Sequence, residues 1–385
     1  MQIFSAAHAL QRTPTLRQVQ RALLLFALLV TLYAQADNHF SSWSDKTICR
    51  LLKAQPEHVG YRTEAVQRGL DCVPPSATTP ATTNRLIDTL IDSGKVTILA
   101  AADVSKKDLN NTKKWMNVAA KTWFSKPTAA SPYYYPVVIT LVGKSTSAAA
   151  GLEQELCKEL KAKAYATRLC GRYLSGYAVN GGAGINSSRM NDGFHFMVIG
   201  TIRRTPSDDL GDTVLHEAFH IYQQSQITTQ RRDLFEQKFG RKSGDHNRDV
   251  PWWSEGTATY LAYLTYARQP GVRQGYLKNM MRCDLGDCEG RKTPRISEYF
   301  DLGIKLYNID YGDNRDIAYR LGGLFAAYLI NDVGEDKLYA YYESVDELGF
   351  EASFEQHFGK PYREYINQFE GFLKQPLRQL LKVIP

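Results

Sequence analysis

Two histidines four residues apart constrain the fold of this chain more than any other feature. They lie in residues 213–222 (TVLHEAFHIY) as His216 and His220. On an α-helix this spacing places both side chains on one face, so both imidazoles can reach a single ion. Their neighbours are mostly apolar or uncharged. The run therefore predicts a largely buried helix that carries two ligands of a metal site.

The residues before this run predict where the helix begins. Thr205 can act as the N-cap, and Pro206 suits the first helical turn. Asp208 and Asp209 favour the positive end of the helix dipole. We therefore expect the helix to begin at about residue 205.

A candidate for the third ligand is Glu255, in residues 251–260 (PWWSEGTATY). A hydrolytic zinc site needs three protein ligands and one open position. A second helix is predicted to begin at Asp249 or Pro251, which places Glu255 in its opening turns. The small Gly256 would let this helix pack closely against the first. The alternative is that Glu255 is an ordinary surface residue near a helix N-terminus.

The order of elements predicts the fold class. Short apolar runs rich in β-branched residues predict strands at residues 95–101, 133–143 and 194–202, and an apolar face predicts a helix at residues 108–124. The chain after Pro206 is predicted to be helical. We expect an α+β fold, with a mixed sheet and one helix from about residue 92 to 202. A mainly helical second half follows, with the metal site between the two halves.

The N-terminus predicts export from the cytoplasm. A basic stretch ends at Arg21, an apolar run follows at residues 22–34, and small residues precede Asp37. We expect residues 1–36 to be a cleaved signal peptide, because the apolar run is shorter than the ~20 residues of a membrane-spanning helix. The mature protein would be secreted or periplasmic, without stable insertion into a membrane.

The net charge argues against nucleic acid as a partner. The chain carries +7, and loss of Arg12, Arg17 and Arg21 with the signal peptide lowers this to +4. So mild a charge gives no basis for binding nucleic acid. We expect none.

Six cysteines indicate disulfides in an exported protein. Pairing between neighbours is the simplest of fifteen possible connectivities. The alternative, a second metal site, is disfavoured because no C-x-x-C spacing occurs. The neighbouring pairs are Cys49 with Cys72, Cys157 with Cys170, and Cys283 with Cys288.

Composition predicts a small module ahead of a large domain. Residues 73–91 begin with a Pro-, Thr- and Ala-rich segment (VPPSATTPATT) and are expected to be a linker. Residues 37–72 before it end in EAVQRGLDC. This segment resembles a small cysteine-paired helical module that recurs in secreted bacterial proteins, and a disulfide is what so short a piece needs to stay folded. Residues 92–385 form the large domain.

HEAFH followed downstream by WWSEGTATY resembles the gluzincin metallopeptidases, whose second zinc helix often reads W-x-x-E-G-x-A. The resemblance implies a zincin-like fold for residues 92–385. It also implies Zn²⁺ held by His216, His220 and Glu255, with Glu217 as the catalytic carboxylate. Gln223 suits the subset of the family in which H-x-x-Q follows the second histidine.

The implied chemistry is hydrolysis of a peptide bond. Zinc lowers the pKa of its bound water to about 7, and Glu217 can take a proton from that water. Tyr319, in AYRLGG, resembles the Y-x-x-G segment whose tyrosine stabilises the oxyanion in several gluzincins. Tyr319 could instead only pack, in which case Tyr260, Tyr328 or His195 is the next candidate for the oxyanion donor.

One departure from the family narrows the substrate. The aminopeptidase N type carries G-x-M-E-N before the zinc helix, whereas residues 182–186 here read GAGIN, without the glutamate that holds a free amine. The metzincin pattern H-x-x-G-x-x-H is also absent. We therefore expect an endopeptidase that acts on proteins or peptides. The alternative is a non-catalytic zinc-binding protein that recognises a surface partner through residues 37–72.

Overall fold

The computed structural model describes residues 44–54, 65, 68, 70, 72, 88–89, 95–125, 128–165, 170–171, 174–202, 209–229, 232–238, 251–286, 288, 296–310 and 312–385. The chain divides into two compact units, Met1–Thr82 and Thr83–Pro385. The predicted signal peptide, residues 1–36, lies outside the described residues. So do residues 73–87 of the predicted linker.

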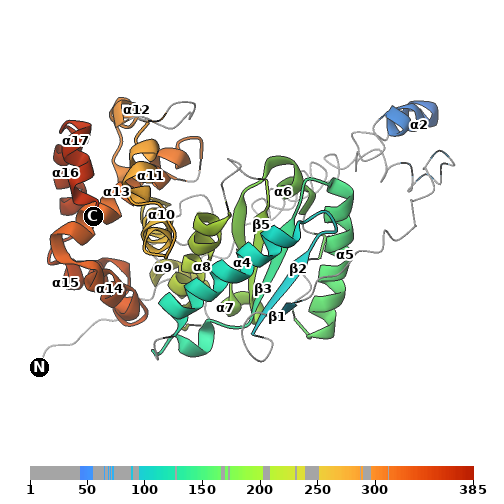
Figure 1. The fold of residues 1–385 in the computed structure, drawn as a ribbon, viewed down its shortest axis with the longest axis horizontal. Helices are drawn as coiled ribbons and strands as arrows, with labels where there is room; N and C mark the ends of the chain where they lie inside the picture. The colour runs from blue at the N-terminus through green and yellow to red at the C-terminus, as the bar shows by residue number, and fades with distance from the viewer. Residues whose placement is uncertain are drawn as a thin grey trace, which may run out of the picture. The chain divides into compact units, whose positions relative to one another are not determined.

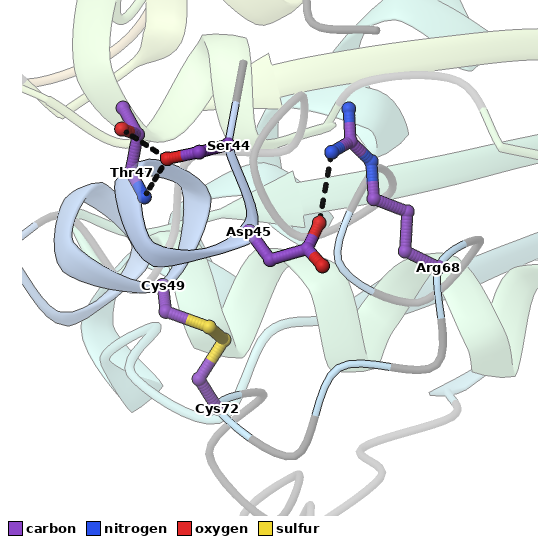
Figure 2. Close-up of a disulfide and its surroundings, with 6 residues drawn as sticks. All are labelled: Ser44, Asp45, Thr47, Cys49, Arg68 and Cys72. Carbon is purple, nitrogen blue, oxygen red and sulfur yellow. Dashed lines mark hydrogen bonds and ion pairs between the residues drawn. A yellow bond between two sulfur atoms is a disulfide. The ribbon is translucent and has the colours of Figure 1, made fainter.

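The first unit contains helix α2 (Asp45–Ala54), which is joined to the chain after it by a disulfide between Cys49 and Cys72 (Figure 2). Arg68 donates to the Asp45 carboxylate at 2.9 Å, and so ties the same two segments together. A disulfide stabilises so short a piece mainly by restricting its unfolded state.

The second unit is built on one five-stranded mixed sheet of order β1-β2-β3-β5-β4 (Figure 1). The central strands β2, β3 and β5 run parallel, while β1 and β4 pair antiparallel at the two edges. Because β1 lies within residues 73–91, the sheet begins before residue 92, where the domain was expected to start. The strands are β1 (Asp88–Thr89), β2 (Val96–Ala100), β3 (Val137–Val142), β4 (Ala183–Ser187) and β5 (His195–Gly200).

Every residue of the three central strands is buried. Since successive side chains point to opposite sides of a sheet, both faces of these strands are covered. In β3, Val137, Ile139 and Leu141 face a core shared with the second half of the chain. Val138 and Val142 face a smaller core on the other side. The sheet is therefore the middle layer of the domain.

Helices cover both faces of the sheet (Figure 1). Helix α4 (Lys106–Ala119), which continues into a π-helical turn η1 (Ala120–Phe124), packs in the larger core. Helices α5 (Thr146–Ala162) and α6 (Leu174–Asn180) pack in the smaller core. The prediction of a single helix before residue 202 is therefore wrong. Helix α5 follows a capping serine, and its leucines recur every four residues, so its signal was present in the sequence.

The described residues after 209 form helices and short 3-10 turns, so the predicted division into a sheet-containing half and a helical half is confirmed. Two of these helices carry the histidine pair and Glu255. The helices are α8 (Gly211–Ser225), α9 (Arg232–Lys238), α10 (Pro251–Ala267), α11 (Tyr276–Asp284), α12 (Ile296–Asp301), α13 (Arg315–Val333), α14 (Glu335–Leu348), α15 (Phe350–Phe358), α16 (Tyr362–Leu373) and α17 (Leu377–Leu380).

The first of these helices does not begin where the sequence suggested. Helix α8 begins at Gly211, after Leu210 in a left-handed conformation, so Thr205 is not its N-cap. Residues 203–208 lie outside the described residues. Asp209 instead accepts hydrogen bonds from the amide of Gly211 and the hydroxyl of Tyr266. The start of α8 is thus fixed by a contact with α10, which local sequence does not reveal.

Helix α10 lies between α8 and α13 and packs against both. Its described part begins at Pro251, one of the two predicted starts, and the other, Asp249, lies outside the described residues. The expected partner of Gly256 is wrong, because Gly256 faces Gly322 of α13 rather than α8. A Cβ added to Gly322 would lie 3.0 Å from the Cα of Gly256, so the two backbones are in direct contact.

All six cysteines are paired, and the pairs are the three neighbouring ones: Cys49 with Cys72, Cys157 with Cys170, and Cys283 with Cys288. Disulfides are typical of proteins in oxidising compartments. In the part of the chain that the structure describes, no helix has the length and apolar character to cross a bilayer.

Candidate metal centre

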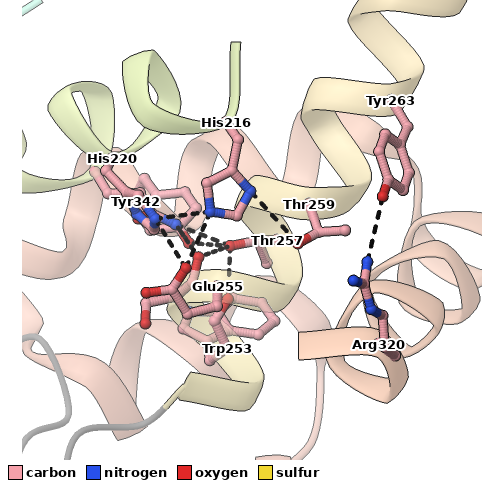
Figure 3. A network of polar contacts seen from close by, with 11 residues as sticks. His216, His220, Trp253, Glu255, Thr257, Thr259, Tyr263, Arg320 and Tyr342 are labelled. Atoms are coloured by element: carbon pink, nitrogen blue, oxygen red, sulfur yellow. Dashed lines mark hydrogen bonds and ion pairs between the residues drawn. The ribbon is translucent and has the colours of Figure 1, made fainter. Parts of the chain in front are cut away.

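His216 and His220 of α8 meet Glu255 of α10 at one point (Figure 3). The Nε2 atoms of the two histidines lie 3.1 Å apart. Each of them lies 3.0 Å from Oε2 of Glu255. His220 and Glu255 are buried, and His216 is half-buried. The structure thus brings together all three of the ligands that the sequence predicted.

With Glu255 ionised, as its lowered pKa implies, no arrangement of hydrogens satisfies this triangle of three atoms. Each Nε2 carries at most one hydrogen. If both nitrogens donate to Glu255, two N–H groups face each other across 3.1 Å, and if one does not donate, its lone pair faces the carboxylate. A cation bound to all three atoms removes the conflict. Ligands at about 2.1 Å from a tetrahedral ion lie about 3.4 Å apart, close to the observed spacing, so the group could hold a metal ion.

The charges around the triangle also favour a cation. Burial alone would raise the pKa of Glu255, but His220 and His216 hold that pKa well below its usual range. Burial alone would lower the pKa of His220, but the nearby carboxylates of Glu255 and Glu217 raise it to about 9. Two carboxylates therefore share this buried space and require positive charge to balance them.

Gln223 fixes the orientation of His220. Its Oε1 accepts from Nδ1 of His220 at 2.8 Å, which leaves Nε2 of that ring free to bind a cation. Its Nε2 in turn lies within 2.9 Å of the Ser254 carbonyl, the Thr257 hydroxyl and the Tyr342 hydroxyl. The family pattern pointed to this position. Its partners could not be read from the sequence, since Tyr342 lies 119 residues away on α14.

The Nδ1 atom of His216 has a more distant partner than Nδ1 of His220 has. Nδ1 of His216 lies 3.4 Å from the hydroxyl of Thr259, one turn after Glu255 on α10 (Figure 3). Sequence reasoning missed Thr259. Its spacing of four residues from Glu255 is the signal that would have placed it on the same face of α10.

Glu217 lies beside the triangle but is not part of it. Its side chain is 6% exposed and lines the same cavity as the three ligands. Burial raises the pKa of Glu217, although the two histidines and the backbone N–H of Ile185 act against this. A carboxylate with a raised pKa takes up a proton more readily, which is what a general base requires.

Tyr319 of α13 also lines this cavity. Its ring lies parallel to that of His216, with the centroids 6.4 Å apart. Burial, followed by the charges of Glu255 and Glu217, raises the pKa of Tyr319 above its usual value. The hydroxyl therefore remains protonated and can donate a hydrogen bond at neutral pH.

The other candidates for the oxyanion donor lie elsewhere. Tyr260 and Tyr328 do not line the cavity, and Tyr328 packs against the rings of Phe369 and Phe372. His195 faces away, because its Nε2 donates to the Tyr133 carbonyl at 2.8 Å. Of the four candidates, Tyr319 is thus the one at the site.

The cavity over the triangle has a volume of about 680 Å³. It is lined by Gly182, by Ala183 to Ile185 of the edge strand β4, and by residues of α8, α10 and α13. Two arginines of α13, Arg315 and Arg320, also line it. A cavity of this size accommodates several residues of an extended peptide or a comparable ligand.

Neither a search against models of known protein families nor a search of curated proteins finds a match to this chain. The inference about function therefore depends on the site and its motifs.

Proposed function

We propose that this protein is a zinc-dependent metallopeptidase of the gluzincin type with a zincin-like fold. The observation that carries the proposal is the convergence of His216, His220 and Glu255 on one point, with a non-ligand carboxylate, Glu217, beside them. Two imidazoles and a carboxylate suit zinc among the common metals. Three ligands leave a fourth position for water, as hydrolysis requires.

Glu217 acts as the general base. When bound, zinc supplies an acidified water and polarises the substrate carbonyl. Glu217 takes a proton from the attacking water, a bond forms between the water oxygen and the carbonyl carbon, and the C–N bond then breaks. The same carboxyl group returns the proton to the departing amine. Its burial and its raised pKa suit both steps.

Tyr319 donates its hydroxyl hydrogen to the oxygen that becomes negative in the transition state. The close approach of α13 to α10 at Gly322 and Gly256 places this hydroxyl on the same side of the cavity as Glu255. A donor fixed before the reaction costs little reorganisation when the charge develops.

The substrate is a protein or peptide bound in an extended conformation along β4. In the described sheet this strand is paired only with β5, and its residues border the cavity, where the Ile185 N–H already donates to Glu217. An extended chain can add to such an edge through backbone hydrogen bonds, regardless of where its ends lie. Because residues 182–186 lack a carboxylate to hold a free amine, internal peptide bonds are the target. The three disulfides support an activity outside the cytoplasm.

The test is metal analysis of the mature protein combined with cleavage of an unfolded protein substrate. We expect about one zinc per chain, and cleavage that stops with a chelator and returns with zinc. His220→Ala and Glu255→Ala should lose metal and activity together, whereas His357→Ala on α15 should lose neither. Stable zinc binding without cleavage of any unfolded substrate would contradict the proposal and favour a non-catalytic zinc-binding protein.

A further inference from the structure

A second cavity lies on the opposite side of α8 from the metal ligands. Its volume is about 270 Å³, and it lies between η1, α8 and α14. Tyr222 of α8 lines it, two residues after His220. Two residues correspond to a rotation of about 200° around a helix, so this cavity and the metal centre face opposite ways. A ligand in this cavity would therefore bind independently of the proposed peptidase activity.

Aromatic side chains form much of the wall of this second cavity. Trp123, Tyr134, Tyr222 and Tyr339 all line it. The rings of Tyr222 and Tyr339 stand at 90° to one another with centroids 5.9 Å apart, and so form a corner. Trp123 donates its indole N–H to the Tyr339 hydroxyl at 3.3 Å, which fixes that corner. Faces of tryptophan and tyrosine attract cations through their ring quadrupoles.

Tyr222 presents a polar atom to the cavity that the protein does not use. Its side chain is 4% exposed, and the ring is enclosed by Tyr134, Phe219 and Tyr342. Within the described part of the chain, nothing hydrogen-bonds to its hydroxyl. A ligand that supplies an N–H group can donate a hydrogen bond to this hydroxyl.

The rim of the cavity is acidic. Glu335, Asp336 and Glu343 of α14 line it. Glu335 is already neutralised by Arg268, with N–O distances of 3.1 and 2.7 Å. Asp336 and Glu343 form no ion pair with the described residues, so the rim keeps a net negative charge. Negative charge above an aromatic wall attracts cations and repels anions.

We propose that this cavity binds an organic cation that carries N–H groups, namely the ammonium or guanidinium head of a lysine- or arginine-like group. The aromatic faces enclose its alkyl stem and its charge. Tyr222 accepts a hydrogen bond from the head, and Glu343 balances the charge at the rim. A quaternary ammonium lacks the N–H group that Tyr222 requires, so it binds more weakly. The cation comes either from a basic residue of a protein chain or from a free amine.

The test is calorimetric titration of the full mature chain with four probes. These are Nα-acetyl-lysine methylamide, Nα-acetyl-arginine methylamide, butylammonium and tetramethylammonium, with neutral Nα-acetyl-norleucine methylamide as the control. We expect saturable binding of at least one N–H cation, weaker binding of tetramethylammonium, and none of the norleucine derivative. Preference for the amino-acid derivatives indicates a protein chain as the source, and preference for butylammonium indicates a free amine.

Two variants locate the binding. Tyr222→Phe keeps the ring and removes the acceptor, so affinity should fall about tenfold. Glu343→Gln should lower affinity by about threefold at low salt and less at high salt. Glu347→Gln, one turn further along α14 and outside the cavity, is the matched control and should leave affinity unchanged. Equal binding of the neutral probe, an unchanged affinity in Tyr222→Phe, or no binding of any cation would overturn the proposal.

Discussion

Gly256 of α10 and Gly322 of α13 are in backbone contact, with room for no side chain between them. This contact decides how near α13 comes to the metal centre. Tyr319 lies one turn before Gly322, so the glycine pair brings its hydroxyl to the cavity above Glu255. The glycine of the Y-x-x-G segment therefore has a steric reason to be a glycine.

Gly322→Ala should separate α10 from α13 and destabilise the protein by at least about 1–3 kcal/mol, because the added methyl group meets backbone atoms that cannot move aside. Chemical unfolding measures this change. Gly323→Ala is the control, since its Cβ would have 3.6 Å to the nearest atom and should cost little. Equal stability of the two variants would show that the contact is not tight.

Glu217→Gln should abolish hydrolysis and leave zinc bound, because it removes the base and no ligand. Zinc content and turnover on the same preparation check both halves of this prediction. Asp212→Asn, which also removes a negative charge from the cavity lining, should retain most of the activity. Turnover by Glu217→Gln near the parent rate would assign the base to another group.

Tyr319→Phe should leave zinc affinity and folding intact and lower kcat by a factor of about 10²–10³, or roughly 2.7–4 kcal/mol, since its interaction exists mainly in the transition state. Tyr328→Phe is the control, because that ring packs between α13 and α16 away from the cavity. A Tyr319→Phe rate within a factor of about three of the parent would mean that Tyr319 only packs.

Gln223→Ala should weaken zinc binding by about 10–100-fold, because His220 loses the acceptor that orients its ring. Competition with a chelator of known affinity gives the measurement. Thr259→Val should have a smaller effect, since its contact with His216 is longer, at 3.4 Å. The reverse order of effects would show that Gln223 stabilises only the packing of α8 against α10.

His195 should make the folded state sensitive to acid. Burial is the main cause that lowers the pKa of His195 to about 4, from 6.5 when the chain is unfolded. Below pH 6.5 the unfolded state therefore binds a proton that the folded state excludes, so stability is lost as the pH falls toward 4. At pH 4 the loss amounts to about 3 kcal/mol.

The free energy of unfolding of the parent and of His195→Gln is measured between pH 7 and pH 4. The difference between the two slopes of this free energy against pH gives the contribution of His195. The variant should lose stability less steeply over that window. His357→Gln, which alters a less buried histidine on α15, should keep most of the parent slope. Parallel slopes for the parent and His195→Gln would contradict the low pKa of His195.

Local patterns determined the elements that carry the ligands. The spacing of His216 and His220 places them on one face of α8 as a matter of helix geometry, and Pro251 predicts that a helix opens shortly before Glu255 because proline fits only the first turn. The three central strands and the neighbouring cysteine pairs were equally readable, whereas the edge strands β1 and β4 were not predicted. All of these depend on residues close together in the sequence.

Only the tertiary structure decided what meets across long separations. It set the start of α8 through Asp209 and Tyr266, turned Gly256 toward α13, and joined Gln223 to Tyr342. It also showed that Tyr319 lines the cavity and that Tyr260 and Tyr328 do not, a distinction that the sequence could not make. The physical reason is that these relationships depend on how helices pack against one another, and a local pattern states which face of a helix is buried but not against which partner.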